Sequence, residues 1–282
     1  MAQASLVAAM LQDRHEGVTF EIVVVETEGD RDLKTPLSAL GGRGVFAKQI
    51  QLAVLEGRAD VAVHSAKDLP SITPEGLVLA AIPERRDAAD VLVGSTLAGL
   101  GPGATVATGS PRRRALLLEM RPDLNVVELR GNMAARLAKV GSNGIDAIVA
   151  AAAALERLEI VPEVWERLEP EIFTPQVGQG AIALETREGL SAELVAGIGD
   201  SSVEQCVLAE RAFQETLGSG CTIPAGAWAT HSAGMITLRG VLAHLDGHVV
   251  ARDERQGQDP RLLGQLVANT VLEEYQRRVE LP

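Results

Sequence analysis

The octapeptide VHSAKDLP, residues 63–70, places several chemically capable side chains directly after a mainly apolar run. They are His64, Ser65, Lys67 and Asp68. The run before them, residues 59–63, predicts a buried strand that brings these side chains to the C-terminal edge of a sheet, where open α/β folds bind ligands. A Lys67–Asp68 pair by itself would suit a solvated turn better, so a functional interpretation needs support from elsewhere.

Arginines at the start of predicted helices give that support. In residues 108–113, TGSPRR, a glycine turn precedes a serine N-cap, a proline at the first helical position and two arginines, Arg112 and Arg113. Exposed backbone N–H groups, the positive end of a helix and two guanidinium groups together favour an anion at this point. The alternative for this motif alone is a well-capped helix with exposed arginines.

Arginine recurs at the next two junctions of the same kind. Arg130 closes the strand predicted at residues 125–129, Arg136 follows it, and Arg157 follows the strand predicted at residues 147–151. Because three consecutive strand–helix junctions present arginine, we infer a polyanionic ligand with several carboxylates or phosphates. The chain has no Walker loop and no GxGxxG motif after a strand, which disfavours a nucleotide.

The two cysteines lie in different settings. Cys221 follows the glycines of GSGC in a loop, an exposed setting suited to covalent chemistry, whereas Cys206 falls within a predicted helix and is interpreted as a small packed hydrophobic residue. The five histidines form no helical i, i+4 ligand pair and no cluster with cysteine, so we expect no metal site.

The elements that position these residues follow an alternating pattern. In the first part of the chain we expect a helix over residues 1–17, a strand at 19–26, a long loop or lid at 27–44, a helix at 45–56, and strands at 59–63 and 77–82. In the middle we expect strands at 104–107, 125–129 and 147–151, each followed by a helix. This alternation predicts an α/β fold with a parallel sheet. Residues 83–90 and 175–180 connect the units, and a strand is expected at 181–185.

The last part of the chain changes character and predicts a small α+β unit. Ser201 and Glu204 suggest a capping box at the start of a helix that continues to residue 217. Strands are expected at 236–241 and 248–252. The final helix has Asp259 as its cap and Pro260 at its first position.

Composition limits the classes of partner. The chain has 282 residues, enough for two or three domains, with a net charge of −12 and only 2% aromatic residues. A nucleic-acid surface of basic residues and stacking rings is therefore not expected. No apolar segment is long enough to span a membrane, and the first residues lack the basic region and cleavage site of a signal peptide, so we expect no membrane partner and a cytoplasmic location.

In order along the chain, the motifs TEGD, GGRGVF, ADVAVHSAKDLP, TGSPRR, LRGN, LERL, VGQGA, AER and GSGCTIP resemble those of the porphobilinogen deaminase (hydroxymethylbilane synthase) family. The resemblance covers nearly the whole chain. It implies a transferase of tetrapyrrole biosynthesis that joins four porphobilinogen molecules head to tail with loss of ammonia. Growth would begin on a dipyrromethane cofactor attached by a thioether to Cys221, and Asp68 would be the catalytic carboxylate.

The resemblance also implies which residues contact the pyrrole carboxylates. The cofactor-binding set is Lys67, Thr108, Ser110, Arg112, Arg113, Arg130 and Gly131. The substrate-binding set is Arg136, Arg157 and Phe46, the last as a ring stacked near the cofactor or, by its helical spacing, as a core residue. His64 and Ser65 are interpreted as mainly structural.

The implied fold is α/β with three domains, of which the first two resemble type II periplasmic binding proteins. Domain 1 would comprise residues 1–84 and 180–198, domain 2 residues 89–175, and domain 3, the small α+β domain with the cofactor cysteine loop, residues 200–282. Residues 83–90 and 175–180 would act as hinges, and the enzyme would be a monomer.

Some features depart from the family pattern. The chain begins at a helix, without the N-terminal strand and Arg-x-Ser motif of the family, which indicates a shortened or misassigned start or a degraded paralogue. Ala39 stands where many members have lysine, Gly109 where serine is common, and Arg43 where lysine is common. The alternatives to an active enzyme are a catalytically impaired paralogue and a two-lobed anion-binding protein.

Overall fold

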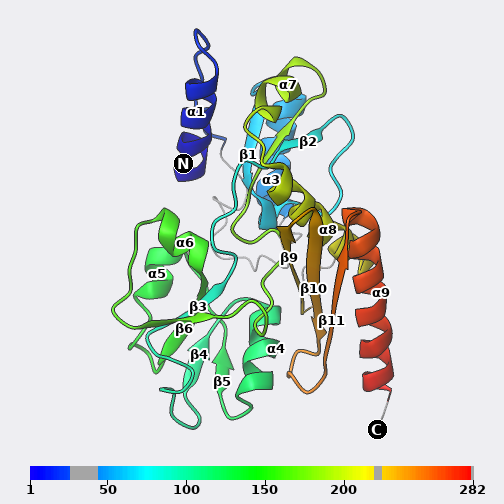
Figure 1. The fold of residues 1–282 in the computed structure, drawn as a ribbon. Helices are drawn as coiled ribbons and strands as arrows, with labels where there is room; N and C mark the ends of the chain where they lie inside the picture. Colours follow the sequence, from blue (N-terminus) through cyan, green and yellow to red (C-terminus); the bar gives the residue numbers. More distant parts are fainter. Residues whose placement is uncertain (26–43, 219–223, 281–282) are drawn as a thin grey trace.

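The computed structural model describes residues 1–25, 44–218 and 224–280, and three β-sheets organise them (Figure 1). The first unit holds α1 (Ala2–Arg14), α3 (Gly44–Leu55), β1 (Val61–Ser65), the 3₁₀ turn η1 (Ala66–Asp68), β2 (Val78–Ala81), β8 (Ile182–Thr186) and α7 (Leu190–Ala196). Its sheet has the order β1-β8-β2, and β8 runs antiparallel to both neighbours. The chain therefore returns to this sheet after passing through the second unit.

The second unit is a five-stranded sheet with the order β5-β4-β6-β3-β7. Its elements are β3 (Asp90–Val93), β4 (Thr105–Ala107), α4 (Pro111–Met120), β5 (Asn125–Val127), α5 (Met133–Leu137), β6 (Ala147–Ala151), α6 (Ala152–Arg157) and β7 (Trp165–Leu168). Strands β5, β4 and β6 are parallel, whereas β3 is antiparallel to β6 and β7. The predicted parallel sheet is thus correct only for three strands.

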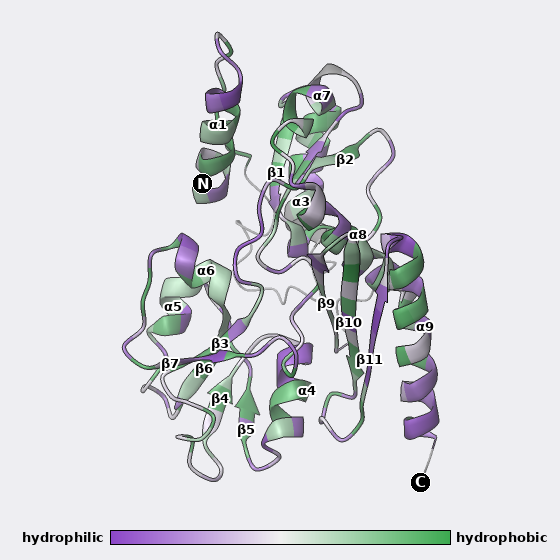
Figure 2. Cartoon of the chain, viewed as in Figure 1, coloured by the Kyte–Doolittle hydropathy of each residue, from purple (hydrophilic) through white to green (hydrophobic). Residues whose placement is uncertain are grey.

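The third unit packs two helices on a meander of three antiparallel strands. It contains α8 (Ser201–Thr216), β9 (Ala225–Ser232), β10 (Met235–Ala243), β11 (Val250–Gly257) and α9 (Pro260–Val279). The central strand β10 is largely hydrophobic and the edge strand β11 is largely hydrophilic (Figure 2). The predicted α/β class with a smaller α+β third unit is confirmed.

One core cluster joins the second and third units. Leu116 of α4 and Phe173 pack with Val241 and Ala243 of β10, and all four side chains are buried. Burying each such apolar side chain stabilises the folded state by about 1.5–3 kcal/mol. The third unit is therefore docked on the second through hydrophobic contacts as well as polar ones.

The predicted strand at residues 19–26 is wrong for its described part. Residues 18–25 form no regular element, and Val23 and Val24 are 50% and 69% exposed. A β-branched run forms a strand only when a neighbouring strand accepts its backbone groups, and this segment pairs with none in the described ranges. Glu26 and the lid predicted at 27–44 lie outside the described residues, apart from Gly44, which begins α3.

Other differences concern short elements. Strands β3, β7 and β9 and helix α7 were not predicted, because these four-residue strands and alanine-containing segments show no clear alternation of apolar and polar residues. The predicted capping box is also wrong. The N-cap of α8 is Asp200, whose side chain accepts hydrogen bonds from the backbone of Ser202 and Val203. Glu204 instead accepts a hydrogen bond from the backbone N–H of Ile82.

Candidate active site

Asp68 lies in η1, directly after strand β1. The predicted strand followed by a polar turn is confirmed, although β1 reaches two residues further and includes His64 and Ser65. Lys67 and Asp68 are each partly exposed, whereas Ala66 and Leu69 on either side of them are buried. The two buried apolar residues therefore anchor a turn whose charged side chains reach solvent.

The second connector, residues 175–180, holds this turn in place. The backbone N–H of Ala66 donates to the carbonyl of Ala181 at 3.0 Å, and Gln176 Nε2 donates to the carbonyl of Lys67 at 2.8 Å. Gly178 has a positive φ of +69°, and a Cβ at this position would lie 2.9 Å from the carbonyl carbon of Ala66. Only glycine allows the connector to approach the Asp68 turn so closely.

His64 and Ser65 hold neighbouring helices against the sheet. Buried His64 has Nε2 3.2 Å from the carboxylate of Glu185 in β8, which also accepts a hydrogen bond from Gln51 of α3 at 2.8 Å. The Ser65 hydroxyl accepts a hydrogen bond from Gln3 of α1 at 2.8 Å. These contacts support the interpretation of both residues as structural.

The TGSPRR motif forms the predicted helix start. Ser110 is the N-cap of α4, Pro111 is at its first position, and the Ser110 side chain accepts a hydrogen bond from the backbone of Arg113. Thr108 is buried, and its hydroxyl accepts a hydrogen bond from the backbone of Ser110 at 3.2 Å. At Gly109 an added Cβ would lie 2.7 Å from the carbonyl oxygen of Leu129. The turn therefore packs closely against the segment that follows β5.

Arg112 and Arg113 are buried, and both face Asp90 at the start of β3. Arg112 Nη2 lies 2.8 Å from Asp90 Oδ2, and Arg113 Nη2 lies 2.6 Å from Asp90 Oδ1. They also donate to the carbonyls of Thr174 and Val149, respectively. The alternative of a well-capped helix with exposed arginines is therefore wrong, and the contact of both arginines with cofactor carboxylates stays a prediction.

The electrostatics of this cluster favour an ionised Asp90. Burial alone would raise the pKa of the carboxyl, but the charges of Arg112 and Arg113 outweigh burial and lower the pKa to about 2. Gln179 of the second connector donates to Asp90 Oδ1 at 2.8 Å and to the carbonyl of Ala88 at 2.7 Å. The cluster thus joins both connectors to the second unit.

Arg136 and Arg157 are desolvated cations with few close anions. Arg136 Nε donates to the carbonyl of Gly131 at 2.7 Å, and within the described part of the chain it forms no ion pair. Arg157 Nη2 donates to the carbonyl of Gly180 at 2.6 Å, with the Glu84 carboxylate 3.9 Å away. Burial lowers the pKa of both guanidinium groups, and the charge of Arg113 contributes at Arg136. Desolvated cations of this kind favour an anionic ligand.

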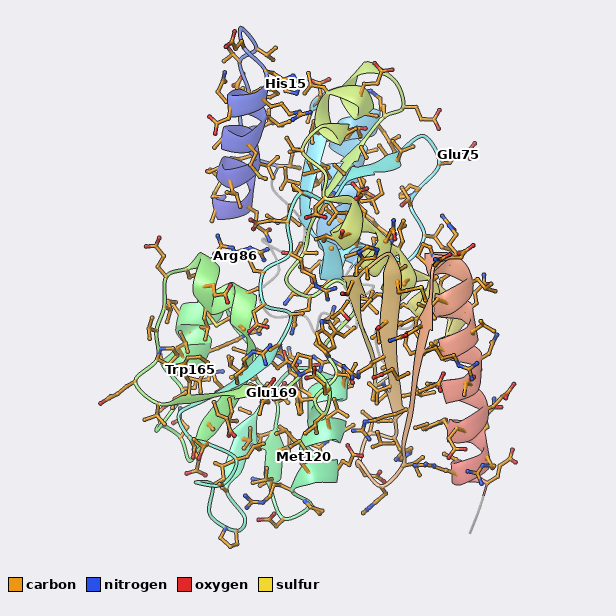
Figure 3. The ribbon with its side chains drawn as sticks, in the orientation of Figure 1. His15, Glu75, Arg86, Met120, Trp165 and Glu169 are labelled. Carbon is orange, nitrogen blue, oxygen red and sulfur yellow. The ribbon has the colours of Figure 1, made fainter. Side chains whose placement is uncertain are left out.

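The remaining members of the predicted set, Arg130 and Gly131, are exposed. Arg130 is exposed and pairs with Glu128 at 2.7 Å. Gly131 has a φ of +109°, a conformation that favours glycine. Arg86 of the first connector, which adds positive charge near Arg157, lies between the first and second units in Figure 3.

The structure connects several of these residues through the second connector. Lys67, beside Asp68, is bound by Gln176, and Arg157 is bound to Gly180. Arg113 contacts Gln179 in the same segment, and its charge reaches Arg136. The Asp68 turn and two arginines of the second unit, Arg113 and Arg157, are therefore bound to one short stretch of chain.

Glu210 is a site residue that the sequence interpretation did not identify. It is fully buried in α8 and accepts hydrogen bonds from Arg85 of the first connector, from the backbone of Gly178 at 2.7 Å and from that of Ala229 at 2.8 Å. It links both connectors to the third unit. The AER motif contains this residue, but its partners are far away in the sequence, so no local signal reveals its role.

Two predicted site residues cannot be placed. The side chain of Phe46, in α3, and all of Cys221 lie outside the described residues. Cys206 is described: it is 5% exposed in α8, and burial, with the charge of Glu210, raises the pKa of its thiol to about 11. A buried thiol that stays protonated is a poor nucleophile, which fits the prediction of a packed residue.

The described ranges hold neither a metal-binding cluster nor a membrane-spanning helix. Residues 1–25, 44–218 and 224–280 contain no group of three or more His, Cys, Asp or Glu side chains that could hold a metal ion. No helix in these ranges is both long and apolar enough to cross a membrane.

Comparison with known proteins agrees with the resemblance inferred from the motifs. Residues 1–194 match the family model "Porphobilinogen deaminase, dipyromethane cofactor binding domain", and residues 204–273 match "Porphobilinogen deaminase, C-terminal domain". Porphobilinogen deaminase of Syntrophotalea carbinolica is 43% identical over 87% of this chain and 79% of its own length. That of Moorella thermoacetica is 44% identical over 96% of this chain and 88% of its own.

Solved structures give only partial likenesses. An ancestral cationic amino acid solute-binding protein covers 70% of this chain and 77% of its own at 18% identity and a TM-score of 0.42. A periplasmic domain from Bordetella pertussis covers 69% and 74% at 19% identity and a TM-score of 0.39. Two family models match the chain, and relatives above 40% identity cover most of its length. The chain therefore belongs to the porphobilinogen deaminase family.

Proposed function

We propose that this chain acts as a hydroxymethylbilane synthase: it condenses four porphobilinogen molecules head to tail, releases ammonia at each step and yields hydroxymethylbilane. The observation that carries the proposal is the attachment of the Asp68 turn and the desolvated Arg157 to the same connector. The Asp68 carboxylate can stabilise a cation, and the Arg157 guanidinium group can bind a carboxylate. A substrate that is a carboxylate-bearing pyrrole, and that becomes cationic when it loses ammonia, needs both.

Asp68 is the proposed catalytic carboxylate. Loss of ammonia from porphobilinogen gives a cationic azafulvene, and a carboxylate beside the pyrrole N–H groups stabilises the developing positive charge and can assist proton transfer. Because η1 is anchored by buried Ala66 and Leu69 and by the connector, the backbone that carries the carboxylate is held in position before substrate arrives. Preorganisation of this kind lowers the cost of reaching the transition state.

Arginines would hold the acetate and propionate groups of the pyrroles. Arg136 and Arg157 supply desolvated guanidinium groups for substrate, and Phe46 would stack nearby. For the dipyrromethane carboxylates the proposed contacts are Lys67, Thr108, Ser110, Arg112, Arg113, Arg130 and Gly131. The residues fit a polycarboxylate, since the charge of Arg113 acts on Arg136 and the charge of Arg86 acts on Arg157. The bound dipyrromethane supplies the pyrrole on which chain growth begins.

Cys221 is the proposed attachment point of the dipyrromethane. Of the two cysteines, Cys206 is buried and has a raised thiol pKa, which leaves Cys221 as the better nucleophile. The glycines before it allow the loop to take conformations that other residues avoid.

Finer features of the enzyme remain proposals. We infer three domains with the bounds 1–84 plus 180–198, 89–175 and 200–282, hinged at the two connectors. We also infer a monomer that works in the cytoplasm and binds no nucleic acid. The net charge of −12 supports the last inference.

The stoichiometry of ammonia tests this function. The purified full-length chain is incubated with porphobilinogen, and ammonia and linear tetrapyrrole are both quantified. We expect four molecules of ammonia for each hydroxymethylbilane. Binding of porphobilinogen without ammonia would favour the two-lobed anion-binding alternative, and slow release with the correct ratio would indicate the impaired paralogue.

A further inference from the structure

A pocket of about 410 Å³ lies between strand β2 of the first unit and helices α8 and α9 of the third. None of its lining residues belongs to the candidate active site. Its volume falls in the range of small-molecule sites, about 300–1,000 Å³. The apolar part of its wall includes Leu79 and Ala80 of β2 and Leu208 of α8, and its polar part includes Ser71 and Arg211.

Arg211 is a buried cation without an ion-pair partner in the described part of the chain, although the charges of Glu185 and Glu215 act on it from beyond ion-pair distance. Only 8% of the residue is exposed, and its guanidinium group donates one hydrogen bond, from Nη2 to the carbonyl of Ser71 at 2.9 Å. It forms no ion pair with any described residue. By contrast, Arg85 is similarly buried and pairs with Glu210, the residue next to Arg211.

Such an arrangement is costly unless an anion enters the pocket. Buried charges in proteins are normally paired, because removal from water without a partner is strongly unfavourable. The hydroxyl of Ser71 is also buried without a hydrogen-bond partner in the described ranges, so a second polar group lies beside the guanidinium. Both groups line the same pocket.

The other charges at the pocket define what the anion would meet. Arg261 of α9 adds a second cation, and its positive charge interacts unfavourably with that of Arg211. Two carboxylates also line the wall. Glu204 is occupied with the backbone N–H of Ile82, and Glu215 lies near enough to act on Arg211 without forming an ion pair. The site therefore suits a ligand with a single anionic group better than a polyanion.

We propose that this pocket binds a small organic carboxylate, with the carboxylate on Arg211 and an apolar body against Leu79 and Leu208. A carboxylate matches the forked donors of arginine, and an apolar body matches the aliphatic wall. The site does not depend on the proposed enzymatic function, because it uses neither Asp68 nor the arginines of the second unit.

Ligand-observed NMR with benzoate tests the proposal on the full chain carrying its cofactor. We expect benzoate to bind the wild type saturably and to bind Arg211→Met at least about tenfold more weakly. The neutral analogue benzamide should bind the wild type with much lower affinity than benzoate does. Leu208→Trp, which fills the pocket and keeps the cation, should also weaken benzoate binding at least tenfold. Near-ultraviolet circular dichroism checks that both variants are folded.

Arg136→Met is the matched control, since it removes a desolvated arginine from the candidate active site. It should leave benzoate affinity within about twofold of the wild type. The proposal is overturned by the absence of benzoate binding to the wild type, by equal binding of benzamide, or by affinity that falls in Arg136→Met but not in Leu208→Trp.

Discussion

Asp68 and its neighbours show how much chemistry a local sequence signal can reveal. A strand followed by a polar turn, and a serine N-cap followed by proline and arginines, both appear in the structure at the predicted places. Asp90 and Glu210 had no such signal, because Arg112 and Arg85 lie 22 and 125 residues away from them in the sequence. Pairing over such separations is decided by the tertiary fold, so the orientation of Arg112 and Arg113 toward Asp90 was not predictable.

Asp68→Asn is predicted to keep the covalent dipyrromethane and to lose turnover. The amide cannot offer a negative charge to a cationic azafulvene, and we expect kcat to fall at least about 100-fold, as is typical when a positioned acid–base group is removed. Initial rates of tetrapyrrole formation measure the loss. Glu75→Gln, an exposed carboxylate in the following loop (Figure 3), is the matched control and should retain activity. Near-normal rates for Asp68→Asn would remove Asp68 from the mechanism.

At the scale of elements, the connector that carries Gly178 matters most, since it supports the Asp68 turn and Arg157 together. Most helices and strands β10 and β11 were predictable from apolar periodicity and caps, including Asp259 as the N-cap of α9. Strands β3 and β7 were not, because a strand of only four residues carries no distinctive period. The antiparallel insertion of β3 between β6 and β7 likewise depends on long-range pairing.

Gly178→Ala is predicted to disturb the Asp68 turn. The new Cβ would meet the backbone of Ala66 at 2.9 Å in a residue with positive φ, so we expect a loss of about 1–3 kcal/mol in unfolding free energy together with reduced kcat. Urea unfolding and initial rates measure the two effects.

Gly144→Ala provides the comparison for that substitution. Gly144 has a φ of +72° but no atom within 4 Å of an added Cβ, so only the backbone strain remains, about 1–2 kcal/mol. Its kcat should match the wild type. Equal kcat values for the two variants would contradict a positioning role for the connector.

At the scale of the whole molecule, two buried ionic clusters hold the three units together. Asp90 with Arg112, Arg113 and Gln179 joins the connectors to the second unit. Glu210 with Arg85 joins them to the third. Since both connectors are held by buried polar groups, the relative placement of the units depends on charges as well as on the shared hydrophobic core.

Asp90 is predicted to make stability sensitive to acid. Its pKa in the folded state, about 2, lies below the ordinary value of 3.8, so its ionisation contributes about 2 kcal/mol that is present above pH 4 and is lost as pH falls toward 2. Asp90→Asn should lower the unfolding free energy at pH 7 by about 3–5 kcal/mol and flatten its dependence on pH between 4 and 2. Urea unfolding at a series of pH values measures both.

Asp123→Asn serves as the control for Asp90→Asn, because Asp123 forms an exposed pair with Arg121 that solvent screens. Its unfolding midpoint at pH 7 should stay close to that of the wild type. If Asp90→Asn also left the midpoint unchanged, the ionic cluster would not be what holds the connectors.

The central claim is that this chain builds a tetrapyrrole on a dipyrromethane attached to Cys221, and the intact mass of the recombinant protein tests it most directly. We expect the wild type and Cys206→Ala to carry a mass increment equal to two linked pyrroles, and Cys221→Ala to lack it. An unmodified wild-type mass from cells that make haem, or an increment that persists in Cys221→Ala, would contradict the account.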